Sequence, residues 1–266
     1  MRRPYGNKVM PMTEPIKIVF LRHGESTWQK ENRFAGWTDI DLTEQGRAEA
    51  RRAGRLMGAA GLSFDVVFTS YLKRGIRTTW LALEGMDLMW IPEVKTWRLN
   101  ERFYGALQGL NRSETAAKYG EEQVRKWRRG YFELPPQITK DDPRFPGRDP
   151  RYKEVPMHEL PTGESLELAV KRVMPCWEQL ILPELRRGKR VLVSAHINSI
   201  RALVKNLDAL TPEQVEKLEI PLGFPLVYEL GENYKPLTHY YLGDPKEIEA
   251  YINRTLNQGK AAPQKQ

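Results

Sequence analysis

Residues Val19–Trp28 read "VFLRHGESTW", and the chain passes there from apolar residues directly into an arginine, a histidine and a glycine. With the three residues before it, this stretch begins with "IKIVFL", an apolar run of strand length. A second apolar run, "RVLVSAH", also ends on a histidine, His196. Open α/β sheets bind ligands in the crevice outside the carboxyl ends of their strands. The sequence therefore predicts that His23 and His196 share one pocket.

Helix and strand signals alternate along the rest of the chain. Residues 65–70 and 86–94 have the composition of strands, whereas residues 43–61, 72–83 and 199–207, together with a long segment from about Ser165, have helical spacing. Alternating strands and helices are typical of a parallel sheet covered on both faces. We therefore predict an α/β fold, a three-layer sandwich with a mostly parallel central sheet flanked by helices.

The 266 residues are consistent with one large α/β domain. We expect a flexible N-terminal extension over residues 1–15 and a single domain over residues 16–250. Residues 131–163 are rich in proline and have no clear period, so they predict an ordered surface excursion within that domain.

Composition limits the classes of partner and cofactor. The single cysteine, Cys176, permits no disulfide within the chain, and no apolar run approaches the length of a membrane span, so we expect a cytoplasmic protein without a membrane partner. The net charge is +8, but no nucleic-acid-binding motif accompanies it, and we expect a small anionic substrate and no nucleic acid. With four histidines and no ligand pattern among the acidic residues, we expect no metal.

The residues around His23 suit phosphate chemistry. A neutral imidazole is a good nucleophile toward phosphorus, and the transferred group spreads its charge over oxygens that need preorganised cations and donors. Arg22 and Arg74 offer planar guanidinium groups, and Ser26 offers a hydroxyl. A structural role for either histidine alone is the simpler interpretation, but the combination with the two arginines favours a phosphoryl-transfer site.

Six motifs, in order and with matching spacing, extend this interpretation to nearly the whole chain. The sequence resembles the cofactor-dependent (2,3-bisphosphoglycerate-dependent) phosphoglycerate mutases of the histidine phosphatase superfamily in "LRHGESTWQKENRFAGWTDIDLTEQG", "TSYLKRGIRT", "LNERFYGALQGLNRSETAAKYGEEQV", "WRRGYFELPP", "AHINSIRALVK" and "IPLGFPLVYEL".

The resemblance implies a role for each matching position. His23 corresponds to the histidine that is phosphorylated, His196 to its partner, Arg22 and Arg74 to the arginines that bind the phosphoryl group, and Glu101 to the general acid and base. The remaining implied site residues bind substrate or phosphate, and they are Ser26, Asn32, Ala35, Gly36, Tyr104, Arg112, Arg128, Arg129 and Asn198. The resemblance also places residues 251–266, a C-terminal tail, near the active site.

Several positions inside these motifs depart from the family. The family usually has asparagine, serine or threonine, histidine, lysine, glycine and threonine where this chain has Gln29, Ala35, Phe103, Arg112, Ile197 and Leu222. Ile197 is the most consequential, because a β-branched side chain resists a positive φ and adds bulk beside His196.

Three functions follow from the match and its departures. The first is a glycolytic and gluconeogenic mutase that interconverts 3-phosphoglycerate and 2-phosphoglycerate through a phosphohistidine, with 2,3-bisphosphoglycerate as the priming donor. The second is a histidine-type phosphatase or a bisphosphoglycerate mutase. The third is a catalytically weakened binding or scaffold protein. The resemblance further implies a homodimer or homotetramer.

Overall fold

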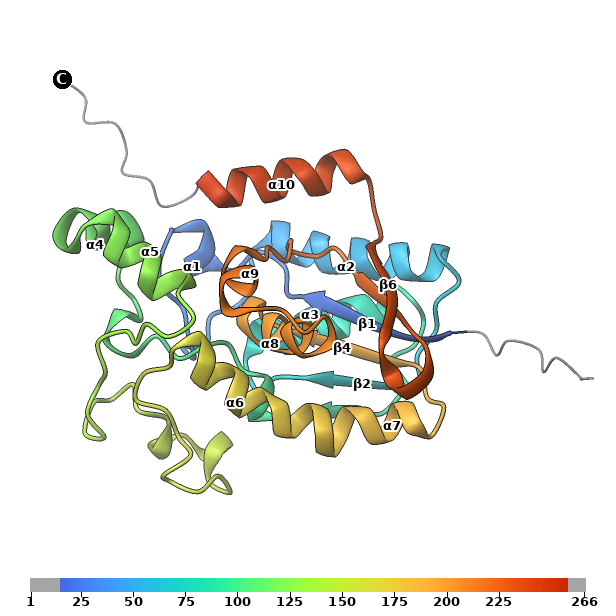
Figure 1. Ribbon diagram of the computed structural model, residues 1–266, viewed down its shortest axis with the longest axis horizontal. Helices are drawn as coiled ribbons and strands as arrows, with labels where there is room; N and C mark the ends of the chain where they lie inside the picture. The colour runs from blue at the N-terminus through green and yellow to red at the C-terminus, as the bar shows by residue number, and fades with distance from the viewer. Residues whose placement is uncertain (1–14, 258–266) are drawn as a thin grey trace, which may run out of the picture.

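The computed structural model describes residues 15–257, and these contain a six-stranded sheet in the order β3-β2-β4-β1-β5-β6 (Figure 1). Strands β3, β2, β4 and β1 run parallel, and β5 and β6 continue the sheet antiparallel. The predicted α/β fold class with a mostly parallel central sheet is confirmed. The strands are β1 (Ile16–Arg22), β2 (Val66–Thr69), β3 (Glu93–Lys95), β4 (Val191–Ala195), β5 (Leu226–Leu230) and β6 (Pro236–Tyr241).

The helices begin where the sequence offers caps. Thr43 accepts a hydrogen bond from the amide of Gly46 at the start of α2, and Ser165 accepts one from the amide of Leu168 at the start of α6. Within residues 15–257 the α-helices are α1 (Thr27–Lys30), α2 (Glu44–Ala59), α3 (Lys73–Glu84), α4 (Arg112–Tyr119), α5 (Glu121–Arg129), α6 (Leu166–Cys176), α7 (Leu182–Arg186), α8 (Ile197–Leu207), α9 (Pro212–Lys217) and α10 (Pro245–Asn257). A π-helical stretch, Trp177–Ile181, joins α6 to α7.

Strand β1 shows why the molecule has three layers. Successive side chains of a strand point to opposite faces of the sheet. Ile18 and Phe20 lie in a core with residues of α6 and α8, whereas Val19 and Leu21 lie in a second core with residues of α2 and α3. Figure 1 shows α2 on one side of the sheet and α6 and α7 on the other. Burial on both faces explains the continuous apolar run at residues 18–21.

The structure differs from the sequence prediction at two boundaries. The strand predicted over residues 86–94 is reduced to Glu93–Lys95, because residues 86–92 form turns in which Asp87 has a φ of 55°. The predicted domain end at residue 250 falls inside α10, which continues to Asn257. Residues 1–14 and 258–266 lie outside the described part of the chain.

Residues 131–163 contain two short 3₁₀ turns and otherwise irregular backbone. Their apolar side chains nevertheless pack inward. Phe145, Tyr152 and Leu160 join a separate core with Trp37 and Phe103. The stacked rings of Trp37 and Tyr152, whose centroids are 5.0 Å apart, anchor this excursion to the loop that follows α1.

A close approach of two backbone segments fixes the loop after β1 against α2. A Cβ built on Gly46 would lie 2.0 Å from the carbonyl oxygen of Glu25, and one built on Gly24 would lie 2.2 Å from the carbonyl oxygen of Gly46. Neither obstacle is a flexible side chain. The two glycines therefore set how closely the start of α2 approaches the residues around His23.

We predict that Gly46→Ala lowers the free energy of unfolding by about 1–3 kcal/mol, because the added methyl group forces backbone apart. The matched control is Gly58→Ala in the same helix, where a Cβ meets no atom within 4 Å. The control should leave stability unchanged or raise it by up to about 1 kcal/mol through better helix propensity. Urea unfolding of both variants measures the difference, and equal midpoints would contradict the proposed contact.

Candidate active site

Three adjacent parallel strands end together at one edge of the sheet. Arg22 of β1 lies opposite Ala195 of β4, and Thr69 of β2 lies opposite Ser194. The next residue along each strand is His23, His196 or Ser70, and the amide of His23 donates a hydrogen bond to the carbonyl of Ala195 at 3.0 Å. Strand register alone therefore brings these three side chains into one place.

The two histidine rings are in contact, with centroids 4.9 Å apart. Nδ1 of His23 lies 2.7 Å from the carbonyl oxygen of Gly24. Because a carbonyl can only accept, Nδ1 carries the proton and donates it, which leaves the lone pair of a neutral ring on Nε2. Nε2 of His196 is 2.8 Å from the hydroxyl of Ser70. The arrangement presents His23 as a nucleophile held in one tautomer.

Both imidazoles are held neutral. Burial, together with the nearby charges of Arg74 and Arg22, keeps the pKa of His23 well below its usual range. Burial and Arg74 do the same to the pKa of His196, and His23 adds to the effect. Desolvation penalises the charged imidazolium. A neutral ring is the form that can attack phosphorus.

Two buried arginines flank His23 and are fixed by backbone carbonyls. Arg74 donates to the carbonyls of Thr38 at 3.0 Å and Gly36 at 2.7 Å, and Arg22 donates to the carbonyl of Ile220 at 2.6 Å. These contacts hold the guanidinium groups without neutralising them. A first cavity of about 60 Å³ opens here, lined by Arg22, His23, Ser26, Gln29, Arg33, Ala35, Gly36, Arg74, Glu101, Tyr104, Arg112 and Ile197.

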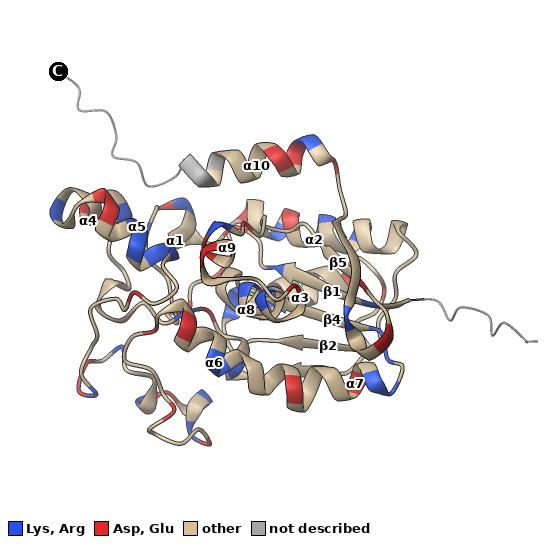
Figure 2. Cartoon of the chain, viewed as in Figure 1, with Lys and Arg blue, Asp and Glu red and all other residues tan. Residues whose placement is uncertain are grey.

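A second cavity of about 60 Å³ shares five lining residues with the first and is strongly basic. Figure 2 shows Lys and Arg, in blue, on α5 and α8, the helices that supply three of its arginines. Burial and the charges of Arg112 and Arg129 lower the pKa of Arg128 to about 9. The lining residues are Arg22, Gln29, Tyr104, Arg112, Arg128, Arg129, Ile197, Asn198, Arg201, Glu219, Tyr251 and Thr255.

Glu101 lies at the wall of the first cavity with one carboxylate oxygen already engaged. Its Oε1 accepts hydrogen bonds from the side-chain amide of Asn198 at 2.8 Å, from the backbone amide of Asn198 at 3.3 Å and from the amide of Arg102 at 2.7 Å. These contacts orient the group and leave Oε2 to meet a substrate proton.

Comparison with known proteins agrees with this geometry. The family model described as the histidine phosphatase superfamily (branch 1) matches residues 18–240. The chain belongs to that superfamily. Members catalyse phosphoryl transfer, so an enzyme is the expected activity class.

Solved structures share the fold at low identity. A mycobacterial glucosyl-3-phosphoglycerate phosphatase has a TM-score of 0.64 at 21% identity over 85% of this chain and 97% of that one. The alpha-ribazole phosphatase of Shigella flexneri has a TM-score of 0.62 at 18% identity over 86% of this chain and 96% of that one. At these identities the similarity shows the fold.

Most of the residues predicted from the sequence lie at the two cavities of this member of the superfamily. His196 lies directly behind His23 with no exposed surface. Asn32 differs, because its amide donates to the hydroxyl of Ser113 at 2.9 Å, and among residues 15–257 it is not part of either cavity lining. The remaining predicted residues that line a cavity are Arg22, His23, Ser26, Ala35, Gly36, Arg74, Glu101, Tyr104, Arg112, Arg128, Arg129 and Asn198.

The departures from the mutase motifs divide into two groups. Phe103 is fully buried beside Trp37 and Leu222 is buried, and neither is among the described residues that line the two cavities. Gln29, Ala35, Arg112 and Ile197 do line them. The expected backbone strain at Ile197 is wrong, since this residue begins α8 and is not among the positive-φ residues. Only its bulk distinguishes it from glycine at the site.

Several polar residues at the site were not among the site residues predicted from the sequence, and one of them is Arg33 in the first cavity. Ser70 ends β2 and could have been found by the same strand-end rule as the histidines. Arg102 donates to backbone carbonyls of Trp127 and Arg128, and it had no motif role. Arg201 and Glu219 pair with each other in the second cavity, and no local pattern links residues so placed. Tyr251 and Thr255, which belong to the C-terminal tail expected near the active site, bring α10 to that cavity.

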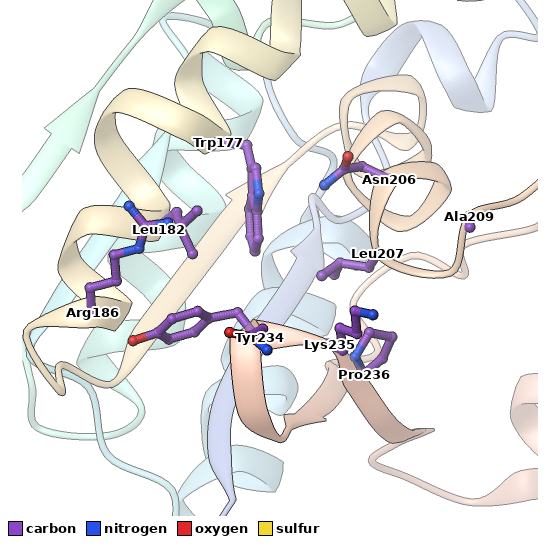
Figure 3. Close-up of a pocket in the computed structure, with 10 residues that line it drawn as sticks. Trp177, Leu182, Arg186, Asn206, Leu207, Ala209, Tyr234, Lys235 and Pro236 are labelled. Carbon is purple, nitrogen blue, oxygen red and sulfur yellow. The ribbon is translucent and has the colours of Figure 1, made fainter.

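A larger hollow than either of these two cavities lies elsewhere. It has a volume of about 660 Å³ and is bordered by Trp177 and Leu182, by Leu207 at the end of α8 and by the turn containing Tyr234 (Figure 3). Helix α8 begins at the active site and rises about 1.5 Å per residue, which puts this hollow about 15 Å away. No predicted site residue lines it.

Within residues 15–257, histidine, cysteine and acidic side chains nowhere gather in a group of three or more that could hold a metal ion. The helices in the same part of the chain are all too short or too polar to cross a membrane.

The buried histidines predict a specific loss of stability in acid. Unfolded histidines take up protons near pH 6.5, whereas His23 and His196 in the folded protein do so only at lower pH. The unfolded state therefore binds more protons as the pH falls below about 6.5, and the free energy of unfolding should drop by up to about 1.4 kcal/mol per pH unit for each histidine. Urea unfolding from pH 7.5 to 5.5 measures this slope. His196→Gln should make it shallower, and an unchanged slope would contradict the assignment.

We predict that Ile197 obstructs the site. Its side chain is partly buried, packs against the core and lines both cavities. A hydrocarbon branch there displaces groups or water that could bind phosphoryl oxygens. Ile197→Ala and Ile197→Gly should each raise phosphoryl-transfer turnover at least tenfold, or about 1.4 kcal/mol of barrier. The alanine variant controls for the poor helix propensity of glycine. Unchanged or lower turnover in both folded variants would show that the side chain fills needed space.

Proposed function

We propose that this protein is a 2,3-bisphosphoglycerate-dependent phosphoglycerate mutase that interconverts 3-phosphoglycerate and 2-phosphoglycerate through phosphorylated His23. The observation that carries the proposal is the pair of adjoining cavities. The first combines a nucleophile with two fixed arginines, and the second offers further arginines for another anionic group. The six sequence motifs favour the mutase over other members of the superfamily.

The residues present suit a doubly phosphorylated primer. Nε of Arg22 and Nε of Arg112 are buried and have no hydrogen-bond partner among residues 15–257. Unpaired buried donors are costly and are satisfied when anionic oxygens arrive. The primer supplies the phosphoryl group, which Arg22 and Arg74 would hold at His23 while Arg112 and Arg128 bind the rest of the molecule.

In the proposed transfer, Nε2 of His23 attacks the phosphorus of a phosphate ester. The new P–N bond forms as the P–O bond to the leaving oxygen breaks, and Glu101 gives its proton to that oxygen. The reverse transfer begins when Glu101 takes the proton of the other hydroxyl, whose oxygen attacks phosphorus and releases His23. Arg22 and Arg74 stabilise the charge on the equatorial oxygens in both directions.

A histidine-type phosphatase is the second candidate, and both solved structures described above carry phosphatase names. In that reaction water replaces the substrate hydroxyl as the acceptor. Tyr251 and Thr255 add α10 to the walls of the second cavity. We propose that this helix limits the access of water, which favours the mutase. The third candidate, a bisphosphoglycerate mutase, would use the same residues. The fourth, a weakened binding protein, would show no turnover.

We also propose a cytoplasmic homodimer or homotetramer with small phosphoglycerate substrates and no nucleic-acid, membrane or metal partner. Strand β3 is an edge of the sheet, and beside it Trp80, Met89 and Trp90 are 52%, 64% and 76% exposed. An exposed edge next to large apolar side chains is suited to contact with another copy.

A coupled assay with 3-phosphoglycerate, run with and without added 2,3-bisphosphoglycerate, tests the proposal. Turnover should depend on the primer, and intact mass spectrometry should show one acid-labile phosphoryl group that His23→Asn abolishes. Release of inorganic phosphate without isomerisation would make the protein a phosphatase. A label that persists in His23→Asn and is lost in His196→Gln would reverse the roles of the two histidines.

A further inference from the structure

Glu219 places a negative charge inside the otherwise basic second cavity. It lies between α9 and β5, and its side chain is only 2% exposed. Oε1 accepts hydrogen bonds from Arg129 and, at 3.3 Å, from Nη2 of Arg201. Arg201 is itself 2% exposed and also donates to the carbonyl of Leu218 at 2.7 Å. One carboxylate thus engages two of the five arginines that line this cavity.

The second oxygen of Glu219 is not engaged in the same way. Oε2 is buried and has no hydrogen-bond partner among residues 15–257. An ionised carboxylate can only accept hydrogen bonds. Oε2 therefore suits a hydroxyl on a ligand, whereas a carboxylate or phosphoryl group placed beside it is repelled.

The position of this charge matters because low-dielectric surroundings strengthen electrostatic interactions. A ligand whose phosphoryl group occupies the cavity at His23 extends toward the second cavity through the five residues that the two share. An anionic group that reaches Arg129 or Arg201 must share them with Glu219. The repulsion grows with the charge of that group, and it is absent for a neutral hydroxyl.

We propose that Glu219 is a specificity-determining residue that limits the negative charge accepted by the second cavity. The ligands it favours are phosphate monoesters whose remaining part carries hydroxyl groups or at most one negative charge. It weakens, without preventing, the binding of a bisphosphate such as the proposed primer, which the five arginines of the same cavity still attract. The choice of test ligands rests on the proposed mutase function. For that reaction, Glu219 weakens retention of the bisphosphate between the two transfers.

A ligand series graded by charge tests the proposal without turnover. In full-length protein carrying His23→Asn, which cannot accept a phosphoryl group, calorimetry measures the Kd of glycerol 3-phosphate, 3-phosphoglycerate and 2,3-bisphosphoglycerate. Their second groups are a hydroxyl, a carboxylate and a phosphoryl group. Adding Glu219→Gln should leave the first Kd within twofold, tighten the second about tenfold and tighten the third about 100-fold.

Matched variants separate charge from structure. Glu164 is a second buried carboxylate, 2.7 Å from Nε of Arg172, and it lines neither cavity in the described structure. Glu164→Gln should leave the relative affinities of the three ligands unchanged. Glu219→Asp, which keeps the charge, should retain the discrimination that Glu219→Gln loses. If Glu219→Gln does not fold, Glu219→Asn provides the second neutral variant.

The outcomes distinguish this proposal from the mutase proposal. Equal tightening or weakening of all three ligands in Glu219→Gln would assign Glu219 a structural role and overturn the charge limit. Failure of all three ligands to bind the parent protein would overturn it as well. A graded series in a protein that does not isomerise 3-phosphoglycerate would support the charge limit and reject the mutase. Isomerisation of 3-phosphoglycerate, together with affinity changes that do not increase with ligand charge, would support the mutase and reject the charge limit.

Discussion

The register between β1 and β4 is the constraint on which the site depends. Pairing of Arg22 with Ala195 makes the next residue of each strand a histidine, and the hydrogen bond from the amide of His23 to Ala195 fixes their separation. A slip of one residue would turn every side chain of β1 to the opposite face. It would exchange Ile18 and Phe20 with Val19 and Leu21 between the two cores. The packing of the whole sheet therefore protects the position of the nucleophile.

Sequence patterns predicted those features of the structure that are set within a single strand or a single helix. The apolar runs ending at His23 and His196 could be read directly, and so could the capped starts of α2 and α6. Contacts between distant segments could not. The ion pair of Glu219 with Arg129 joins residues that are 90 positions apart in the sequence. The side-chain amide of Asn32 donates a hydrogen bond to the hydroxyl of Ser113, which is 81 positions away. The strain expected at Ile197 failed because α8 starts at that residue, and helical φ values are negative.

The site balances two electrostatic requirements. The histidines must be neutral to react, and burial beside Arg22 and Arg74 achieves this by lowering their pKa values. The same arginines must stay charged to bind phosphoryl oxygens, and backbone carbonyls rather than carboxylates hold them in place. Among residues 15–257, two carboxylates line the cavities, one in each. Glu101 lies at the wall of the first cavity, and Glu219 lies among the arginines of the second.

The crowding of arginine side chains at the site also makes the stability of the folded protein sensitive to anions in solution. Burial and neighbouring charges lower the pKa of Arg128 to about 9, and burial lowers that of Arg201 to about 10, so the ligand-free site holds like charges at close range. Anything that binds only the folded state stabilises it by mass action, in proportion to the logarithm of its concentration above Kd. An anion in these cavities would relieve the repulsion among side chains contributed by α5, α8 and the start of α4. On the proposed function, the resistance of this end of the molecule to unfolding would therefore depend on how much phosphorylated metabolite surrounds it.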